Sequence, residues 1–141
     1  MLFRSLTPPR VPMQLAWAHA EASGATVVDV HTPELARAAG LPAHPGFDLL
    51  VIPQNGEKIG VEVKGRLGTG EIEMKANEWA KACNLRENYW LYVVYDCGTP
   101  NPRLLRIQDP FEQLLATNKG SMVVAAKQIF EAAAVATAVE A

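Results

Sequence analysis

The sequence has 141 residues, of which 49% are hydrophobic and 20% are charged, a balance typical of a globular protein with one domain and a substantial core. The formal net charge of −2 excludes the strong overall positive field that many nucleic-acid-binding proteins carry. Two cysteines are too few for a secreted disulfide scaffold, and neither a signal peptide nor an apolar run long enough to span a bilayer is present.

We therefore expect a cytoplasmic protein that makes no membrane contact. Residues 1–11 have no periodicity and are predicted to be a flexible arm, which leaves residues 12–141 as a single domain. A first helix is predicted from Pro12 to Gly24, with a weak apolar stripe of Leu15, Ala18 and Ala22. Glu21 lies in its last turn, where the helix dipole disfavours a carboxylate.

The next elements are a strand over residues 26–31 and a short helix that ends near Ala39. Thr32 is expected to cap this helix, and Pro33 occupies its first position. Two apolar, β-branched segments at residues 46–52 and 59–66 follow, and the link between them contains Asn55-Gly56. Asn-Gly is the strongest short-range signal for a β-hairpin, so we predict that these segments pair.

The predicted hairpin brings charged groups together. Side chains alternate between the two faces of a strand, so Val61 and Val63 point to one face while Glu62 and Lys64 share the other. The hairpin can carry Asp48 to the same side. Two carboxylates and the Val63 carbonyl are the hard oxygen ligands that Mg²⁺ prefers, and Lys64 can orient water or stabilise charge on a phosphate. The alternative is that Glu62 and Lys64 are simply the polar face of an amphipathic strand.

Beyond the hairpin, a glycine-rich loop at residues 65–70 precedes a short extended segment at 71–74. A helix is predicted at residues 76–85, with Trp79 on its core face and both Asn77 and Lys81 on the other. Residues 89–95 are apolar on both faces, which is typical of a central strand covered on both sides. The remaining predictions are a strand at residues 104–107, a helix from Asp109-Pro110 to about residue 116, an edge strand at 121–124 and a final helix at 125–139.

Several motifs, taken in their order along the chain, resemble the C-terminal domain family of the plant protein NO VEIN, which is itself similar to the PD-(D/E)xK nucleases. They are Gly46-Phe47-Asp48, Val61-Glu62-Val63-Lys64-Gly65-Arg66, Asn77-Glu78-Trp79, residues 89–94 and residues 107–110. The resemblance implies an α/β fold with a PD-(D/E)xK nuclease-like mixed central sheet of four to five strands, flanked by helices. One departure is Lys75, where the family tends to have a threonine that opens the helix.

The resemblance also implies roles for individual residues. Asp48, Glu62 and Lys64 take the catalytic positions, and Mg²⁺ or Mn²⁺ would be held by Asp48, Glu62, the Val63 carbonyl and Glu21, which falls where the superfamily often has a carboxylate on its first helix. The residues expected to contact nucleic acid, taken to be DNA, are Arg66, Lys75, Asn77 and Lys81.

The implied function is a metal-dependent endonuclease, or a nuclease module related to restriction and phage defence. Such modules work beside a helicase or methyltransferase partner, and a homodimer is left open. The alternative is an inactive nucleic-acid-binding or helicase-docking module that keeps the nuclease-like fold.

Overall fold

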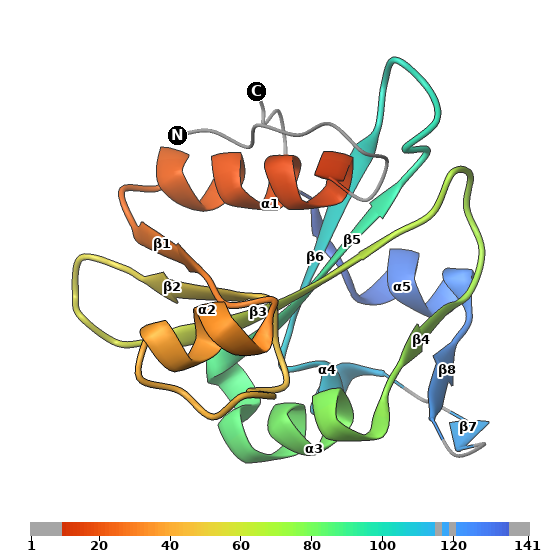
Figure 1. Ribbon diagram of the computed structural model, residues 1–141. Coiled ribbons are helices and arrows are strands. Elements are labelled where there is room, and N and C mark those ends of the chain that lie inside the picture. Colours follow the sequence, from red (N-terminus) through yellow and green to blue (C-terminus); the bar gives the residue numbers. More distant parts are fainter. Residues whose placement is uncertain (1–9, 115–116, 119–120, 136–141) are drawn as a thin grey trace.

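The computed structural model of the chain describes residues 10–114, 117–118 and 121–135 (Figure 1). Its main sheet has the strand order β1-β2-β3-β5-β6-β9. The strands are β1 (Thr26–Asp29), β2 (Leu49–Ile52), β3 (Ile59–Gly65), β5 (Tyr89–Tyr95), β6 (Arg103–Gln108) and the two-residue β9 (Ala134–Val135). The central pair β3 and β5 is parallel and every other pairing is antiparallel. The predicted mixed α/β sheet flanked by helices is confirmed, with β9 as a short addition at its edge.

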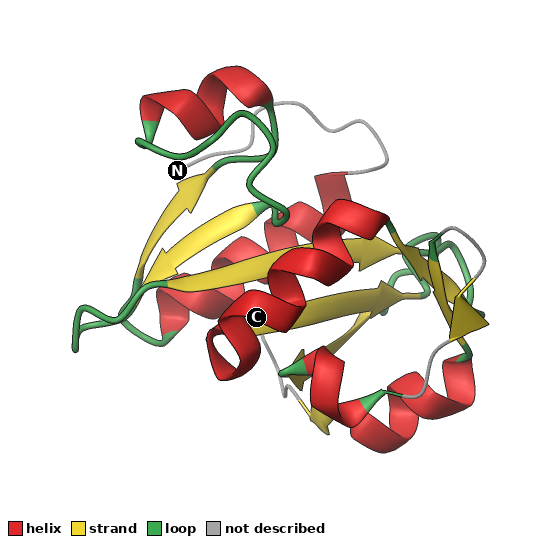
Figure 2. Cartoon of the chain, turned by 90° about the horizontal axis from the view of Figure 1, so that it is seen from below, coloured by secondary structure: helices red, strands yellow, loops and turns green. Residues whose placement is uncertain are grey.

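Helices cover both faces of this sheet (Figures 1 and 2). Helix α1 (Arg10–Ala22) packs on one face, over Leu49, Val61 and Tyr92. The opposite face carries the larger core, which includes buried side chains from α2 (Pro33–Ala38), α3 (Ala76–Leu85) and α5 (Ala126–Ala132). Strand β5 supplies alternate residues to both cores, so the expectation of a central, doubly covered strand is confirmed.

Helix α1 begins at Arg10, two residues before the predicted start, and its buried stripe differs from the prediction. The buried residues of the helix are Pro12, Ala16 and Ala20; of the predicted stripe, Leu15 is partly buried and packs against this core, whereas Ala18 and Ala22 are exposed. Proline and alanine are small enough to let the helix backbone approach the sheet closely, and a hydrophobicity pattern does not register that advantage. The predicted arm lies at residues 1–11, and residues 1–9 are outside the described part of the chain.

Local sequence signals are confirmed in the N-terminal half. The Thr32 hydroxyl accepts a hydrogen bond from the backbone N–H of Leu35 at 3.2 Å, which caps α2 as predicted. Strands β2 and β3 form the predicted antiparallel pair. In the link between them the Asn55 side chain accepts a hydrogen bond from the N–H of Glu57 at 2.8 Å, and Gly56 adopts a left-handed conformation with φ of 83°.

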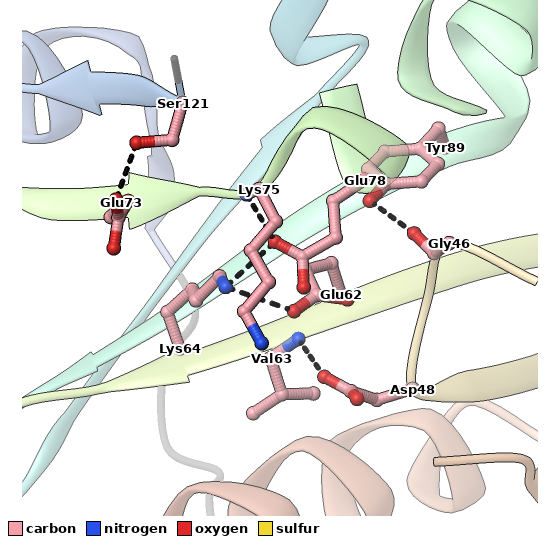
Figure 3. Close-up of polar contacts among 10 residues, drawn as sticks. All are labelled: Gly46, Asp48, Glu62, Val63, Lys64, Glu73, Lys75, Glu78, Tyr89 and Ser121. Atoms are coloured by element: carbon pink, nitrogen blue, oxygen red, sulfur yellow. Dashed lines mark hydrogen bonds and ion pairs between the residues drawn. The ribbon is translucent and has the colours of Figure 1, made fainter. Parts of the chain in front are cut away.

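A second, smaller sheet extends from the end of the main one and has the order β4-β8-β7. It contains β4 (Ile72–Met74), β7 (Thr117–Asn118) and β8 (Met122–Val124). Strand β8 lies between the other two, so the prediction that it is an edge strand is wrong. The Ser121 hydroxyl donates a hydrogen bond to the Glu73 carboxylate beside this sheet (Figure 3).

The C-terminal helices are shorter than predicted. A one-turn 3₁₀ helix, η1 (Arg86–Asn88), leads into β5. Asp109 caps α4 (Pro110–Gln113), which ends before the extended Leu114 rather than near residue 116, and residues 115–116 lie outside the described chain. Helix α5 ends at Ala132 because the chain turns extended at Ala133 and then pairs with β6. The prediction of a helix over residues 125–139 is therefore confirmed for residues 126–132 and wrong for residues 133–135, and residues 136–141 lie outside the described chain.

Candidate functional site

The charged residues predicted to converge do meet at the end of the central strand pair (Figure 3). Glu62 and Lys64 project from β3 to the same face, and the Lys64 Nζ lies 3.2 Å from the Glu62 Oε2. Asp48 immediately precedes β2, and its carboxyl group lines the same hollow as that of Glu62, close enough for its charge to act on Glu62. Glu62 is only 3% exposed, so this acid lies in the interior rather than on a solvated strand face.

Backbone hydrogen bonds hold Asp48 in this position. Its N–H donates to the Val61 carbonyl and its carbonyl accepts from the Val30 N–H, both at 2.9 Å. Its Oδ2 accepts a hydrogen bond from the Val63 N–H at 2.9 Å. The N–H and C=O of one strand residue face the same neighbouring strand. The Val63 carbonyl therefore points to the edge of β3 on which the Asp48 carboxylate lies, as the proposed ligand set requires.

A fourth residue, Glu78 on α3, belongs to the cluster and was not predicted. Its Oε1 accepts hydrogen bonds from the Lys64 Nζ and from the Lys75 N–H, each at 2.8 Å. The second contact satisfies the backbone N–H of Lys75, the N-cap residue of α3, as the N3 glutamate of a capping box does; a threonine at position 75 would instead accept from an N–H further into the helix. The sequence signal was a Glu in the first turn of a helix, which pointed to capping and to nothing more.

Burial and the neighbouring charges shift the pKa of each of the four residues in the cluster. Burial raises the pKa of Glu62 well above its usual range, and the Asp48 and Glu78 carboxylates raise it further. Burial also raises the pKa of Asp48, although hydrogen bonds from a backbone N–H and from Glu62 oppose the rise. Burial tends to lower the pKa of Lys64, but Glu62 and Glu78 outweigh it and the net shift is upward. Burial tends to raise the pKa of Glu78, but its hydrogen bonds to Lys64 and a backbone N–H outweigh that effect and lower it.

Gly46 and Tyr89 fix the turn that precedes Asp48. The Tyr89 hydroxyl donates a hydrogen bond to the Gly46 carbonyl at 2.7 Å, and burial raises the pKa of this tyrosine (Figure 3). Gly46 has φ of 89°, and a Cβ added there would lie 2.6 Å from the Lys81 Cβ. Only glycine fits both constraints, so α3 can press against the turn that delivers Asp48.

A polar hollow of about 260 Å³ opens over the acids. Asp48, Glu62 and Glu78 line it together with Lys75 and Asn77, two of the residues expected to contact nucleic acid. The Lys75 side chain extends from the start of α3 toward the acids (Figure 3).

The other two predicted nucleic-acid contacts lie outside this hollow. Lys81 packs one turn further along α3, against Gly46. Arg66 lies beyond the end of β3, where its Nη1 donates a hydrogen bond to the Glu71 carbonyl at 2.8 Å.

Glu21 is the predicted ligand that the structure does not bring to the cluster. Pro12, at the start of α1, lies against Gly65 at the end of β3 that carries the acids. Glu21 is exposed at the opposite end of α1, where the following Gly24 approaches Gln54 in the hairpin link. Glu21 lines neither of the two hollows that Asp48 lines, so the structure does not bring it to Asp48 and Glu62.

The donor set fits one kind of metal site and not another. Within the described residues, no three Asp, Glu, His or Cys side chains are arranged to hold a metal ion by themselves. Asp48, Glu62 and the Val63 carbonyl are nevertheless hard oxygen donors. Mg²⁺ commonly uses one or two carboxylates and completes its shell with water and substrate phosphate. The cluster therefore suits an open magnesium site and does not suit a closed, all-protein one.

Comparison with known proteins gives one result. The family model described as Protein NO VEIN, C-terminal, matches residues 20–107, a range that contains Asp48, Glu62, Lys64 and Glu78. No curated protein and no solved structure matches the chain. In the described part of the chain, none of the helices combines the length and the apolar character needed to cross a bilayer.

Proposed function

Since this chain belongs to the NO VEIN C-terminal domain family, we propose that it hydrolyses phosphodiester bonds in nucleic acid with the help of Mg²⁺ or Mn²⁺. The observation that carries the proposal is that the carboxyl groups of Asp48 and of the buried Glu62 line one hollow, with the Lys64 ammonium 3.2 Å from Glu62. A protein that needed only a polar strand face would gain nothing by holding these two acids together, because removal from water disfavours the charge of both and the Asp48 carboxylate raises the pKa of Glu62 further.

In the proposal, Asp48, Glu62 and the Val63 carbonyl hold the metal. When bound, the metal supplies Lewis acidity toward the phosphoryl oxygen and lowers the pKa of a water molecule. Lys64 stays protonated, because the carboxylates around it raise its pKa, and it donates hydrogen bonds to charge that develops on the phosphate. Glu78 holds the Lys64 ammonium in place from the helix side, at 2.8 Å.

The chain's other basic groups would hold the substrate. In the proposal, Lys75 and Asn77 contact the phosphates that flank the scissile bond, which is supported by their position in the lining of the same hollow as the acids. Lys81 and Arg66 lie further out, so we assign them to more distant phosphates of DNA. A small domain with a net charge of −2 is expected to bind nucleic acid weakly alone and to work better beside a helicase or methyltransferase.

The alternative is a nucleic-acid-binding or helicase-docking module without turnover. One observation favours it: Lys64 is paired with both Glu62 and Glu78, so the charge of the ammonium is satisfied within the protein. Such a cluster could persist as an internal ion-pair network after catalysis was lost.

The deciding experiment mixes purified protein with Mn²⁺ or Mg²⁺ and single-stranded DNA, duplex DNA and RNA, with and without a helicase. Metal-dependent cleavage that disappears in an Asp48→Asn, Lys64→Ala double variant supports the proposal. Cleavage that persists in that variant assigns the activity to another site or a contaminant. Binding without cleavage under every condition favours the alternative.

A further inference from the structure

A second hollow, of about 390 Å³, lies on the other side of Asp48. The start of α1, the end of β3 and the chain just beyond β5 enclose it, and Asp48 and His31 line both this hollow and the polar one. Its volume is within the range of small-molecule binding pockets, which begins near 300 Å³. The two hollows thus meet at one of the proposed metal ligands.

Backbone hydrogen bonds hold the wall of this hollow in place without a ligand. Beyond the sheet, the backbone of residues 66–68 stays hydrogen bonded to that of residues 94–98. The Arg66 N–H donates to the Val94 carbonyl and the Cys97 N–H donates to the Arg66 carbonyl, each at 3.0 Å. The Gly98 N–H donates to the Leu67 carbonyl at 3.3 Å. The imidazole of His31 is likewise fixed, because its Nδ1 lies 2.6 Å from the Asp29 Oδ1.

The lining of this second hollow is mainly apolar, whereas the lining of the hollow over the acids is polar. Pro12, Met13, Leu67 and Cys97 supply carbon and sulfur surfaces, while Arg66 and His31 add flat groups with hydrogen-bond donors. Leu67 is 73% exposed, the highest value among the large hydrophobic side chains in the described residues. Leu67 thus adds exposed apolar surface to the lining of this hollow.

We propose that this hollow accepts one unstacked nucleobase of the strand whose phosphate lies over Asp48 and Glu62. The inference rests on the proposed function and narrows its substrate to nucleic acid with unpaired nucleotides at the cut. A base needs apolar walls for its faces and a few polar groups for its edge, and this lining offers both. The polar hollow beside it takes the charged phosphate. A base inside a duplex would first have to unstack, so single-stranded or frayed substrates are favoured.

The chain carries its own probe, because Cys97 lines the hollow and Cys83 on α3 does not. We would alkylate the full chain with iodoacetamide in Mg²⁺ and follow both cysteines by mass spectrometry. The additions are a single-stranded DNA oligonucleotide and its duplex form. We expect the single strand to slow alkylation of Cys97 at least threefold, the duplex to slow it less, and Cys83 to react unchanged.

Binding of the same oligonucleotide, labelled with fluorescein, gives an independent readout by anisotropy. Met13→Trp should fill the hollow and weaken binding of the single strand by roughly tenfold, the contribution of one stacked base. Leu35→Trp is the matched control, because Leu35 is exposed on α2 and does not line the hollow. Thermal melts check that both variants fold, and the alkylation test on the unaltered chain does not depend on either variant.

The outcomes separate this inference from the proposed function. If the oligonucleotide binds but leaves Cys97 as reactive as before, and Met13→Trp binds as tightly as the unaltered chain, the base pocket is wrong and the nuclease proposal stands. If the duplex protects Cys97 as well as the single strand does, the requirement for unpaired bases is wrong. If no nucleic acid binds or is cleaved with any metal, both proposals fail together.

Discussion

Replacing Glu62 by Gln tests whether the buried acids form a metal site or a structural ion pair. The substitution keeps the size of the side chain but removes a charge on which the Asp48 carboxylate acts unfavourably. Lys64 keeps its partner Glu78 at 2.8 Å, so the ammonium is not left unpaired. The two interpretations then predict opposite effects on the free energy of unfolding in the absence of metal.

The sign of the effect of Glu62→Gln on the free energy of unfolding follows from the pKa of Glu62, which lies well above its usual value of 4.5 in the folded protein. An acid with a raised folded-state pKa favours folding at low pH and loses that contribution as the pH rises from the unfolded to the folded pKa. Each pKa unit of difference costs about 1.4 kcal/mol at pH values above both. Gln does not titrate, so Glu62→Gln should match the unaltered protein near pH 4 and be more stable at pH 8.

Bound metal should make the unaltered protein more stable than Glu62→Gln. The unaltered protein gains RT ln(1 + [metal]/Kd), which is about 2.7 kcal/mol at a metal concentration of 100 Kd. For a chain of this length that gain corresponds to a rise in Tm of roughly 10 °C. Glu62→Gln should gain little, since it has lost a ligand. The assay is a set of thermal melts between pH 4 and 8, with and without millimolar Mg²⁺ or Mn²⁺.

Glu78→Gln is the matched control, because the pKa of Glu78 is lowered and not raised. The stability that Glu78 contributes is present at neutral pH and is lost as the pH falls through its folded-state pKa, so this variant should be less stable at pH 7 by about 1–3 kcal/mol. If Glu62→Gln is also destabilised at pH 8, and neither metal alters the melts, Glu62 acts as a structural partner of Lys64 and the metal site is refuted.

Three further predictions use the same protein. Asp48→Asn and Lys64→Ala should each abolish cleavage while the fold is retained by circular dichroism, and calorimetry should detect Mn²⁺ binding only in Lys64→Ala, because an ammonium is no ligand for a cation. Lys75→Ala should weaken DNA binding evenly across sequences and reduce by about one the slope of log affinity against log salt, measured by anisotropy; a sequence-dependent loss would contradict a phosphate contact. Trp90→Ala should lower the free energy of unfolding by roughly 3 kcal/mol in urea melts, because this partly buried ring packs on Tyr92 and under the Arg106 guanidinium; an unchanged midpoint would show that the ring adds nothing to the core.

The sequence predicted elements well where the determining contacts are local. The pairing of β2 with β3 follows from Asn55-Gly56, and the start of α2 follows from Thr32 and Pro33, because each signal acts within a few residues. The convergence of Asp48, Glu62 and Lys64 also follows from such signals, since one hairpin and strand alternation place all three.

The sequence failed where the determining contacts are distant. Glu78 reaches Lys64 across the layer between α3 and the sheet, and no spacing rule relates a first-turn helix residue to a strand residue fourteen positions earlier. Glu21 was placed by analogy, but the direction in which α1 crosses the sheet decides which end meets the acids. Alanine-rich residues after Ala132 favour a helix locally, and pairing with β6 overrides that preference.

The hydrogen bond from the Val63 N–H to the Asp48 carboxylate makes one amide a spectroscopic reporter of the site. β2 begins at Leu49, so at this point a side-chain oxygen of the preceding residue takes the place of a backbone carbonyl in the ladder. A carboxylate that gains a proton or shares its electrons with a cation becomes a weaker acceptor, and the ¹H and ¹⁵N resonances of Val63 should move accordingly. A titration of this single cross-peak would therefore follow ionisation and metal occupancy at Asp48 without substrate and without turnover.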